Sequence, residues 1–261
     1  MNTSDSGSAG RGPSNLSLPN KVAIITGGGR GIGRAVALAL GAKGASVVVN
    51  YAGNHDAAAE TVTAVEAAGG KARAVQGKLD GEASVARLFE AALAAFGRID
   101  ILVLNAAIAR FAPIGTVSEA EFDATVAVNM KAPFFCLQQA AKHLADGGRI
   151  VAISAAMTTV GRPNTILYAG TKAALEMFAR AAAKELGPRG ITVNTVLPGA
   201  TETELYLGLS TEASRSEAAK RSPFGRIGQP DDIADVVAFL CSEEARWVSG
   251  QTIVANGGEI G

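Results

Sequence analysis

The sequence predicts an α/β fold in which one parallel sheet is covered by helices on both faces. Three observations support this: seven short apolar runs, alanine-rich stretches of helical periodicity between most of them, and a glycine-rich segment, TGGGRGIG (26–33), directly after the first run. Continuous apolar strands that alternate with helices are typical of a parallel sheet buried on both faces. We therefore predict a single Rossmann-like, doubly wound domain with a seven-stranded parallel sheet.

Each apolar run is short enough to be one strand. In chain order the runs are KVAIIT (21–26), SVVVNY (46–51), ARAVQ (72–76), IDILVL (99–104), GRIVAIS (148–154), ITVNTVL (191–197) and QTIVA (251–255). The intervening stretches predict helices near 31–43, 55–69, 82–96, 118–145, 166–186 and 230–242. Two helix starts carry local signals, because Ser118 with Glu121 forms a capping box and Pro230 suits a first helical turn.

Charge and cysteine content limit the class of protein. The 24 Lys and Arg residues balance 24 Asp and Glu residues, so there is no electrostatic reason to expect binding to nucleic acid or to an anionic membrane. No apolar run approaches the roughly 20 residues of a membrane span. Cys136 and Cys241 lie in apolar, helix-like segments, which favours buried thiols in a reducing cytoplasm over a disulfide. His55 and His143 have no partners at metal-binding spacing, so no metal site is expected.

The two ends of the chain differ in character. Residues 1–17 are rich in Ser, Gly and Asn and contain no apolar core of a secretory signal, so we expect a disordered tail. Residues 18–261 are expected to form the one folded domain, without an internal linker. Trp247 is expected to pack under the C-terminal strand.

The glycine segment predicts a nucleotide site. Glycines between the first strand and the first helix let backbone N–H groups approach a pyrophosphate, which then lies at the positive end of the helix. A glycine loop alone could be a tight turn, but its position between a strand and a helix favours dinucleotide binding.

The end of the second strand indicates which dinucleotide is bound. A site for NAD places an acid there, about 20 residues after the loop, to bind the ribose 2′-hydroxyl. This chain has Tyr51 at that place and no carboxylate before Asp56. Arg30 in the glycine loop could reach a 2′-phosphate, with Ala52 and Asn54 close by, so the sequence predicts NADP(H).

Five segments in order point to a known family. The glycine loop, NAA (105–107), Asn129 in VAVNMKAPFF, Tyr168-x-x-x-Lys172 and VLPGATETE (196–204) together resemble the short-chain dehydrogenase/reductase family over about residues 18–261. Within it, VVVNYAGN, KHLADGGRI, YAGTKAALEMFAR and TETELY are similar to NADPH-dependent ketoreductases, which include 3-oxoacyl-acyl-carrier-protein reductases and fungal polyketide (naphthol) reductases. The resemblance implies hydride transfer between NADP(H) and a ketone or secondary alcohol.

The resemblance also assigns roles to individual residues. Tyr168 would be the general acid and base, and Lys172, on the same helix face, would favour its phenolate and bind the nicotinamide ribose. Asn129 would hold a water that links Lys172 to solvent, and Ser154 is the candidate substrate-binding serine. The implied cofactor-binding residues are Gly27, Gly29, Arg30, Gly31, Ile32, Gly33, Tyr51, Ala52, Asn54, Leu79, Asn105, Tyr168, Lys172, Pro198, Gly199, Thr201 and Thr203.

The chain departs from the family pattern at three places. Lys78-Leu79 stands where Asp-Val usually holds the adenine, and LNAA (104–107) stands where Asn-Asn-Ala-Gly is usual. The usual serine position, thirteen residues before Tyr168, holds Ala155, while Ser154 lies fourteen before it. Neighbouring strand residues point to opposite faces, so this shift matters unless the backbone has already left the strand. Thr158 or Thr159 could also replace the serine.

Two functions therefore stay open. One is an NADPH-dependent reductase of a small-molecule ketone, with an apolar pocket covered by residues 203–225; the other is a catalytically weakened or inert member that binds nucleotide. The apolar helices around 122–145 and 166–186 resemble the family's tetramer interface, so we expect a homotetramer.

Overall fold

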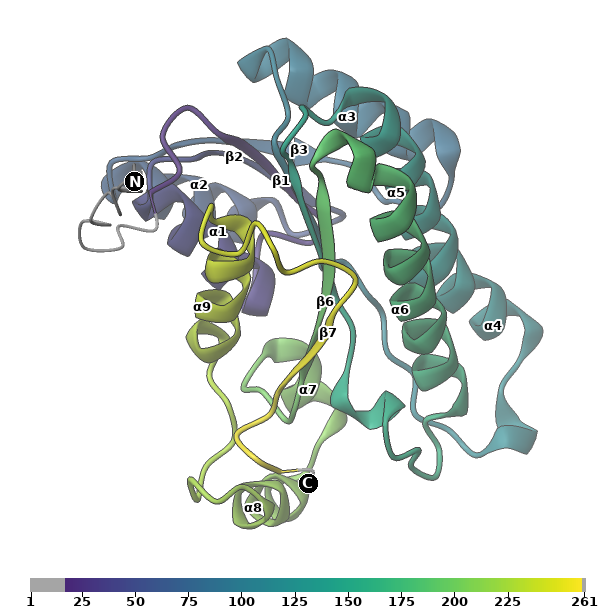
Figure 1. The fold of residues 1–261 in the computed structure, drawn as a ribbon. Coiled ribbons are helices and arrows are strands. Elements are labelled where there is room, and N and C mark those ends of the chain that lie inside the picture. Colours follow the sequence, from purple (N-terminus) through teal and green to yellow (C-terminus); the bar gives the residue numbers. More distant parts are fainter. Residues whose placement is uncertain (1–16, 260–261) are drawn as a thin grey trace, which may run out of the picture.

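The computed structural model describes residues 17–259, so the predicted tail lies outside the described residues except for Ser17. The chain forms one seven-stranded sheet in the order β3-β2-β1-β4-β5-β6-β7, and every pair of neighbouring strands is parallel (Figure 1). The strands are β1 (Val22–Ile25), β2 (Ser46–Tyr51), β3 (Lys71–Gln76), β4 (Ile101–Leu104), β5 (Arg149–Ile153), β6 (Thr192–Pro198) and β7 (Thr252–Ala255). The predicted fold class is confirmed.

Helices cover both faces of this sheet. They are α1 (Gly31–Ala42), α2 (His55–Ala67), α3 (Glu82–Phe96), α4 (Glu119–Val126), α5 (Ala132–His143), α6 (Ile166–Leu186), α7 (Glu204–Leu209), α8 (Glu212–Arg221) and α9 (Pro230–Cys241). One apolar core joins α1, α2 and α9 to the sheet, and the other joins α3, α5 and α6 to its opposite face (Figure 1).

Burial on both faces explains why the strands are continuously apolar. Ile24 and Ile25 are adjacent in β1, and both are fully buried, but Ile24 belongs to the core under α3, α5 and α6 and Ile25 to the core under α1, α2 and α9. Adjacent side chains on a strand point to opposite faces, so a strand between two helix layers needs apolar residues at every position.

The strand order determines where a ligand can bind. The chain moves outward from β1 to β2 and β3, then returns to β4 on the other side of β1. Such a reversal opens a crevice at the carboxyl ends of the strands, where ligands of doubly wound sheets bind.

One predicted helix is interrupted. The stretch 118–145 begins with the expected capping box at Ser118, but between α4 and α5 it contains a π-helical segment, Ala127–Lys131. Pro133 in the first turn of α5 has no N–H to donate to the carbonyl four residues before it, so regular α-helical bonding cannot continue there. Asn129 lies in this π-helical segment and is fully buried.

Two further features differ from expectation. Residues 203–225 contain two short helices, α7 and α8, which were not predicted. Trp247 does not pack under β7, because 95% of its surface is exposed, so that prediction is wrong.

Candidate active site

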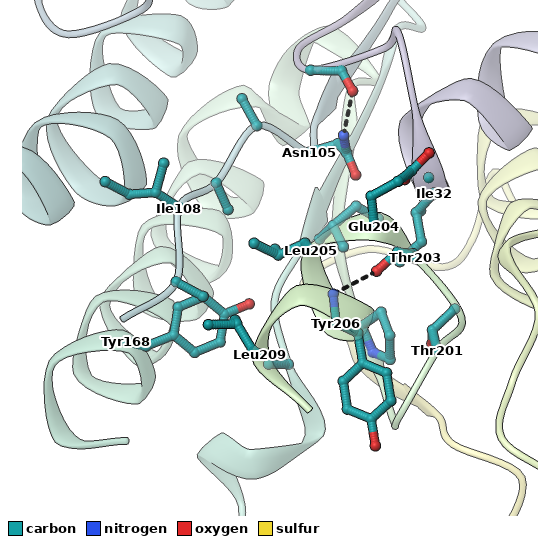
Figure 2. Close-up of a pocket in the computed structure, with 18 of the residues that line it drawn as sticks. Ile32, Asn105, Ile108, Tyr168, Thr201, Thr203, Glu204, Leu205, Tyr206 and Leu209 are labelled. Atoms are coloured by element: carbon teal, nitrogen blue, oxygen red, sulfur yellow. Dashed lines mark hydrogen bonds between the residues drawn. The ribbon is translucent and has the colours of Figure 1, made fainter. Parts of the chain in front are cut away.

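A cavity of about 980 Å³ opens at the carboxyl ends of the strands (Figure 2). Sixteen of the seventeen residues predicted to bind cofactor line it, all except Gly33, and Ser154 lines it as well. Asn129 does not line it, but its side chain accepts a hydrogen bond from the backbone N–H of Ile108, which does. The predicted residues are therefore brought together around one space.

The glycine loop is shaped for close backbone approach. Gly27 and Gly31 have φ values of +63° and +53°, in the left-handed region that favours glycine. A Cβ on Gly33 would lie 2.2 Å from the Gly27 oxygen, so no side chain fits between loop and helix. The Arg30 side chain does not cap α1, which leaves the first N–H groups of the helix for an anion. The loop thus fits the pyrophosphate of a dinucleotide.

Asn105 fastens this loop to β4. Its Nδ2 donates to the carbonyl oxygens of Thr26 and Gly27, both at 3.0 Å, and its side chain borders the cavity (Figure 2). On the other wall, Thr203 caps α7 by accepting from the Tyr206 N–H at 3.2 Å. Asn105 and Thr203 therefore stabilise the fold through these hydrogen bonds, and both still border the cavity, where a ligand can contact them.

The end of the cavity beside β2 and β3 has two cationic side chains, and the Glu204 carboxylate lies on the α7 side of the glycine loop near Gly31. Arg30 and Lys78 line it, and the other lining residues from the ends of these strands include no carboxylate. Tyr51 is buried, and its hydroxyl lies 2.8 Å from His55 Nδ1. The Asn54 side chain caps α2 by accepting from the Ala57 N–H. This end therefore fits the 2′-phosphate of NADP better than the ribose 2′-hydroxyl of NAD, which needs an acidic partner.

Tyr168 and Lys172 lie one helical turn apart in α6, and both are buried at the cavity. Lys172 Nζ donates to the Ile153 carbonyl at 2.7 Å, which anchors it to the end of β5, and it lies 5.8 Å from the centre of the Tyr168 ring. Phe111 packs edge-on against Tyr168, with 5.8 Å between ring centroids. Phe111 was missed from the sequence because it belongs to no motif.

Burial shifts the pKa values of both Tyr168 and Lys172, in each case toward the uncharged form. It raises the pKa of Tyr168 to about 12. It lowers the pKa of Lys172 to about 8, against the charge of Glu176, which raises it. At neutral pH Tyr168 is therefore protonated and Lys172 is mainly an ammonium, the charge states that a proton donor beside a cation requires.

Asn129 joins the π-helical segment to two parts of the site. Its Oδ1 accepts from the Ile108 N–H at 3.0 Å, and its Nδ2 lies 2.9 Å from the Ile108 carbonyl and 3.1 Å from Thr171 Oγ1. Ile108 lines the cavity, and Thr171 is adjacent to Lys172. Asn129 thus holds the loop after β4 against α6.

Ser154 and Ala155 differ in what they face. The Ser154 N–H bonds the Val196 carbonyl, and Ala155 is extended (φ −157°, ψ 137°), so strand geometry continues through both residues. Ser154 Oγ lies 2.6 Å from Glu176 Oε1 and 3.3 Å from the Lys172 carbonyl, inside the contact between β5 and α6. Thr158 and Thr159 donate to the carbonyls of Ala155 and Ala156.

The far end of the cavity is lined by part of the segment 203–225, which was expected to cover it, and by residues that no motif signals. Leu205 and Leu209 project into it from α7 (Figure 2). Arg162, Arg221 and Glu259 line the same end, and each arginine forms an ion pair with Glu259. Among residues 17–259 there is no group of three or more His, Cys, Asp or Glu that could hold a metal ion, and no described helix is long and apolar enough to cross a membrane.

Comparison with known proteins agrees with this geometry. A family model described as enoyl-(acyl carrier protein) reductase matches residues 27–259. The chain belongs to the short-chain dehydrogenase/reductase family, a family of oxidoreductases.

Individual relatives cover nearly the whole chain. An uncharacterized oxidoreductase from Methylorubrum extorquens is 46% identical over 92% of this chain and 98% of its own length. Versicolorin reductase from Emericella nidulans is 40% identical over 94% of this chain and 97% of its own. Among solved structures, an angucycline C-6 ketoreductase with bound NADP is 42% identical, with a TM-score of 0.88 over 93% of this chain and 96% of that one.

Proposed function

We propose that the protein reduces a ketone to a secondary alcohol with NADPH, and that Tyr168 supplies the proton. The observation that carries this proposal is the buried Tyr168–Lys172 pair at the edge of a cavity that also contains the glycine loop. The relatives named for versicolorin reduction and angucycline ketoreduction support a polycyclic, hydroxylated ketone as the class of substrate.

Different residues around the cavity would bind the cofactor and transfer the proton. NADPH, when bound, supplies the hydride. The glycine loop and the start of α1 would hold its pyrophosphate, Arg30 its 2′-phosphate, and Pro198, Gly199, Thr201 and Thr203 would border its nicotinamide end. Tyr168 would give its hydroxyl proton to the carbonyl oxygen as the alcohol forms, and the Lys172 ammonium would stabilise the phenolate left behind.

NADPH consumption with a panel of cyclic and aromatic ketones tests this function. Cofactor binding is measured separately by fluorescence titration. Because Ala155 stands at the usual serine position, the competing function is a nucleotide-binding protein without catalysis. Tight NADPH binding with no consumption across the panel would favour that alternative.

Arg30→Ala is expected to weaken NADPH binding by about 10- to 100-fold and NADH binding much less. The reason is that a hydrogen bond to a charged group contributes about 1.5–3 kcal/mol, and only NADPH carries the 2′-phosphate. Dissociation constants for both cofactors measure the effect. Arg34→Ala is the matched control, since Arg34 is also exposed on α1 but does not line the cavity. Equal losses for the two cofactors would remove Arg30 from this role.

We further propose a cytoplasmic homotetramer. Cys136 and Cys241 are buried and free, which suits a reducing compartment. Phe122, Phe134, Ile166 and Met177 are each about half exposed on the outer face of α4, α5 and α6. Trp247, Val254 and Phe239 are exposed near β7, which is an edge strand. Two separate apolar faces are what a tetramer with two kinds of interface needs.

The mass in solution tests the assembly. We expect four times the chain mass of 26.4 kDa for the wild type, and half of that for Trp247→Glu, because a charge at the second interface leaves the first intact. A monomeric wild type would contradict the proposal.

A further inference from the structure

The end of the cavity beyond Tyr168 combines an apolar wall with a charged one. Phe111, Met157, Leu205 and Leu209 form the apolar wall. The charged wall comes from three separate segments: Arg162 in the loop before α6, Arg221 at the end of α8, and Glu259 near the C-terminus. Figure 1 shows α8 beside the segment that follows β7, and away from α2.

Glu259 is the centre of the charged wall. Its side chain is only 5% exposed, and its Oε1 accepts from Arg162 Nη2 at 3.1 Å and from Arg221 Nε and Nη2 at 3.1 and 2.7 Å. Its Oε2 lies 3.4 Å from the Ala200 N–H. Burial raises the pKa of Glu259, but these donors outweigh it and hold the pKa below its usual value. The carboxylate is therefore ionised at neutral pH.

Two guanidinium groups share this one carboxylate, so one positive charge is in excess. The arginine side chains remain 40% and 42% exposed although Glu259 is buried. Within residues 17–259, the Nη1 groups of both arginines have no hydrogen-bond partner. Both arginines line the cavity, and guanidinium donors that have no partner in the protein are available to a ligand.

Nearby carboxylates do not cancel the excess. Glu217 lines the cavity, but its Oε1 accepts from Lys220 Nζ at 2.7 Å on the surface of α8. Glu204 lies at the other side of α7, beside Ile32 of the glycine loop (Figure 2). The positive charge is thus local to Arg162 and Arg221.

We infer that this end of the cavity binds an anionic oxygen group of the substrate, a carboxylate or an ionised phenol, through Arg162 and Arg221, while the apolar wall holds its ring system. The inference rests on the proposed ketone reductase and narrows its substrate to acidic, ring-containing ketones. A neutral ketone would use the apolar wall alone and bind more weakly.

Calorimetry with 2-naphthoate and 2-naphthamide on the NADP⁺-saturated enzyme tests the inference without turnover. The two probes have the same ring system and differ in charge. We expect the naphthoate to bind about 10- to 100-fold more tightly, as a charge-assisted pair predicts. Arg162→Gln should remove most of this preference, whereas Arg226→Gln, which breaks an exposed pair with Asp232 away from the cavity, should keep it.

Glu259→Gln separates a binding role from a structural one. The glutamine removes the negative charge that the two arginines share, so both guanidinium charges are available to the ligand and naphthoate affinity should rise. The same change removes the two ion pairs and so lowers the stability of the cluster. Equal affinities for the two probes, or an unchanged preference in Arg162→Gln, would overturn the inference. Reduction of an acidic ring ketone, a 1-tetralone that carries a ring carboxylate, tests the reductase function separately, because its failure beside a naphthoate preference would refute turnover and leave the anion site in place.

Discussion

Replacing Tyr168 by phenylalanine is expected to lower the turnover of ketone reduction by at least about 100-fold, because it removes only the hydroxyl that supplies the proton. Phenylalanine preserves the edge-on contact with Phe111 and the packing of a side chain that is 9% exposed. Folding and NADPH binding should therefore stay close to those of the wild type. NADPH consumption with a ketone and titration of bound NADPH measure the two properties separately.

Tyr206→Phe is the matched control for this change. Tyr206 also lines the cavity, but its phenol comes from α7 and has no lysine one turn further along the helix. Its loss should change turnover no more than a few-fold, which would show that the position of the phenol matters. Ketone reduction retained in Tyr168→Phe would mean that another group donates the proton.

The fold could be predicted because burial on both faces leaves a direct trace in the sequence. Each predicted strand overlaps an observed one, with ends that differ by up to two residues. The π-helical segment between α4 and α5 could not be predicted, since the apolar periodicity of 118–145 continues across it. The exposure of Trp247 was also missed, because an aromatic side chain is apolar whether it packs inside a chain or faces outward.

The cofactor end of the site was predictable for a geometric reason. In a parallel sheet the carboxyl ends of all strands lie along one edge, so motifs that follow different strands meet there. Gly27, Tyr51, Asn105 and Pro198 each follow or end a different strand, and all four line the cavity.

The other end of the cavity has no such signal. Glu259 lies 97 positions from Arg162 and 38 from Arg221, and none of the three belongs to a strand end or a recognisable motif. Their meeting depends on how α8 and the C-terminal segment pack, which neither periodicity nor spacing encodes. Substrate-binding residues on connecting segments are generally of this kind.

The contact that Ser154 makes also came only from the structure. Ser154 and Ala155 both line the cavity, but the Ser154 hydroxyl donates to Glu176, one turn beyond Lys172 on α6. Ala155 is extended, so its side chain points away from that of Ser154. These contacts favour Ser154 as a residue that holds β5 against α6, and Ala155 as the position from which a hydroxyl would reach the substrate.

Ala155→Ser is accordingly expected to raise the rate of ketone reduction, by up to the roughly 100-fold that one donor to a developing oxyanion provides. Ala155 lines the cavity and is 7% exposed, so the added oxygen can face the open space instead of the core. The measurement is kcat for a ketone that the wild type reduces slowly, with NADPH saturating.

Ser154→Ala completes the test. This change leaves the Glu176 carboxylate without its 2.6 Å donor, so it should cost about 1–3 kcal/mol of stability while the rate changes little. Thermal unfolding and kcat, measured well below the melting temperature, separate the two effects. If Ser154→Ala instead abolishes turnover in a folded protein and Ala155→Ser brings no gain, then the Ser154 hydroxyl leaves Glu176 during the reaction and is itself the partner of Tyr168. The opposite pattern would establish that this family member works with a substrate-oxygen donor missing, and that one oxygen atom at residue 155 restores it.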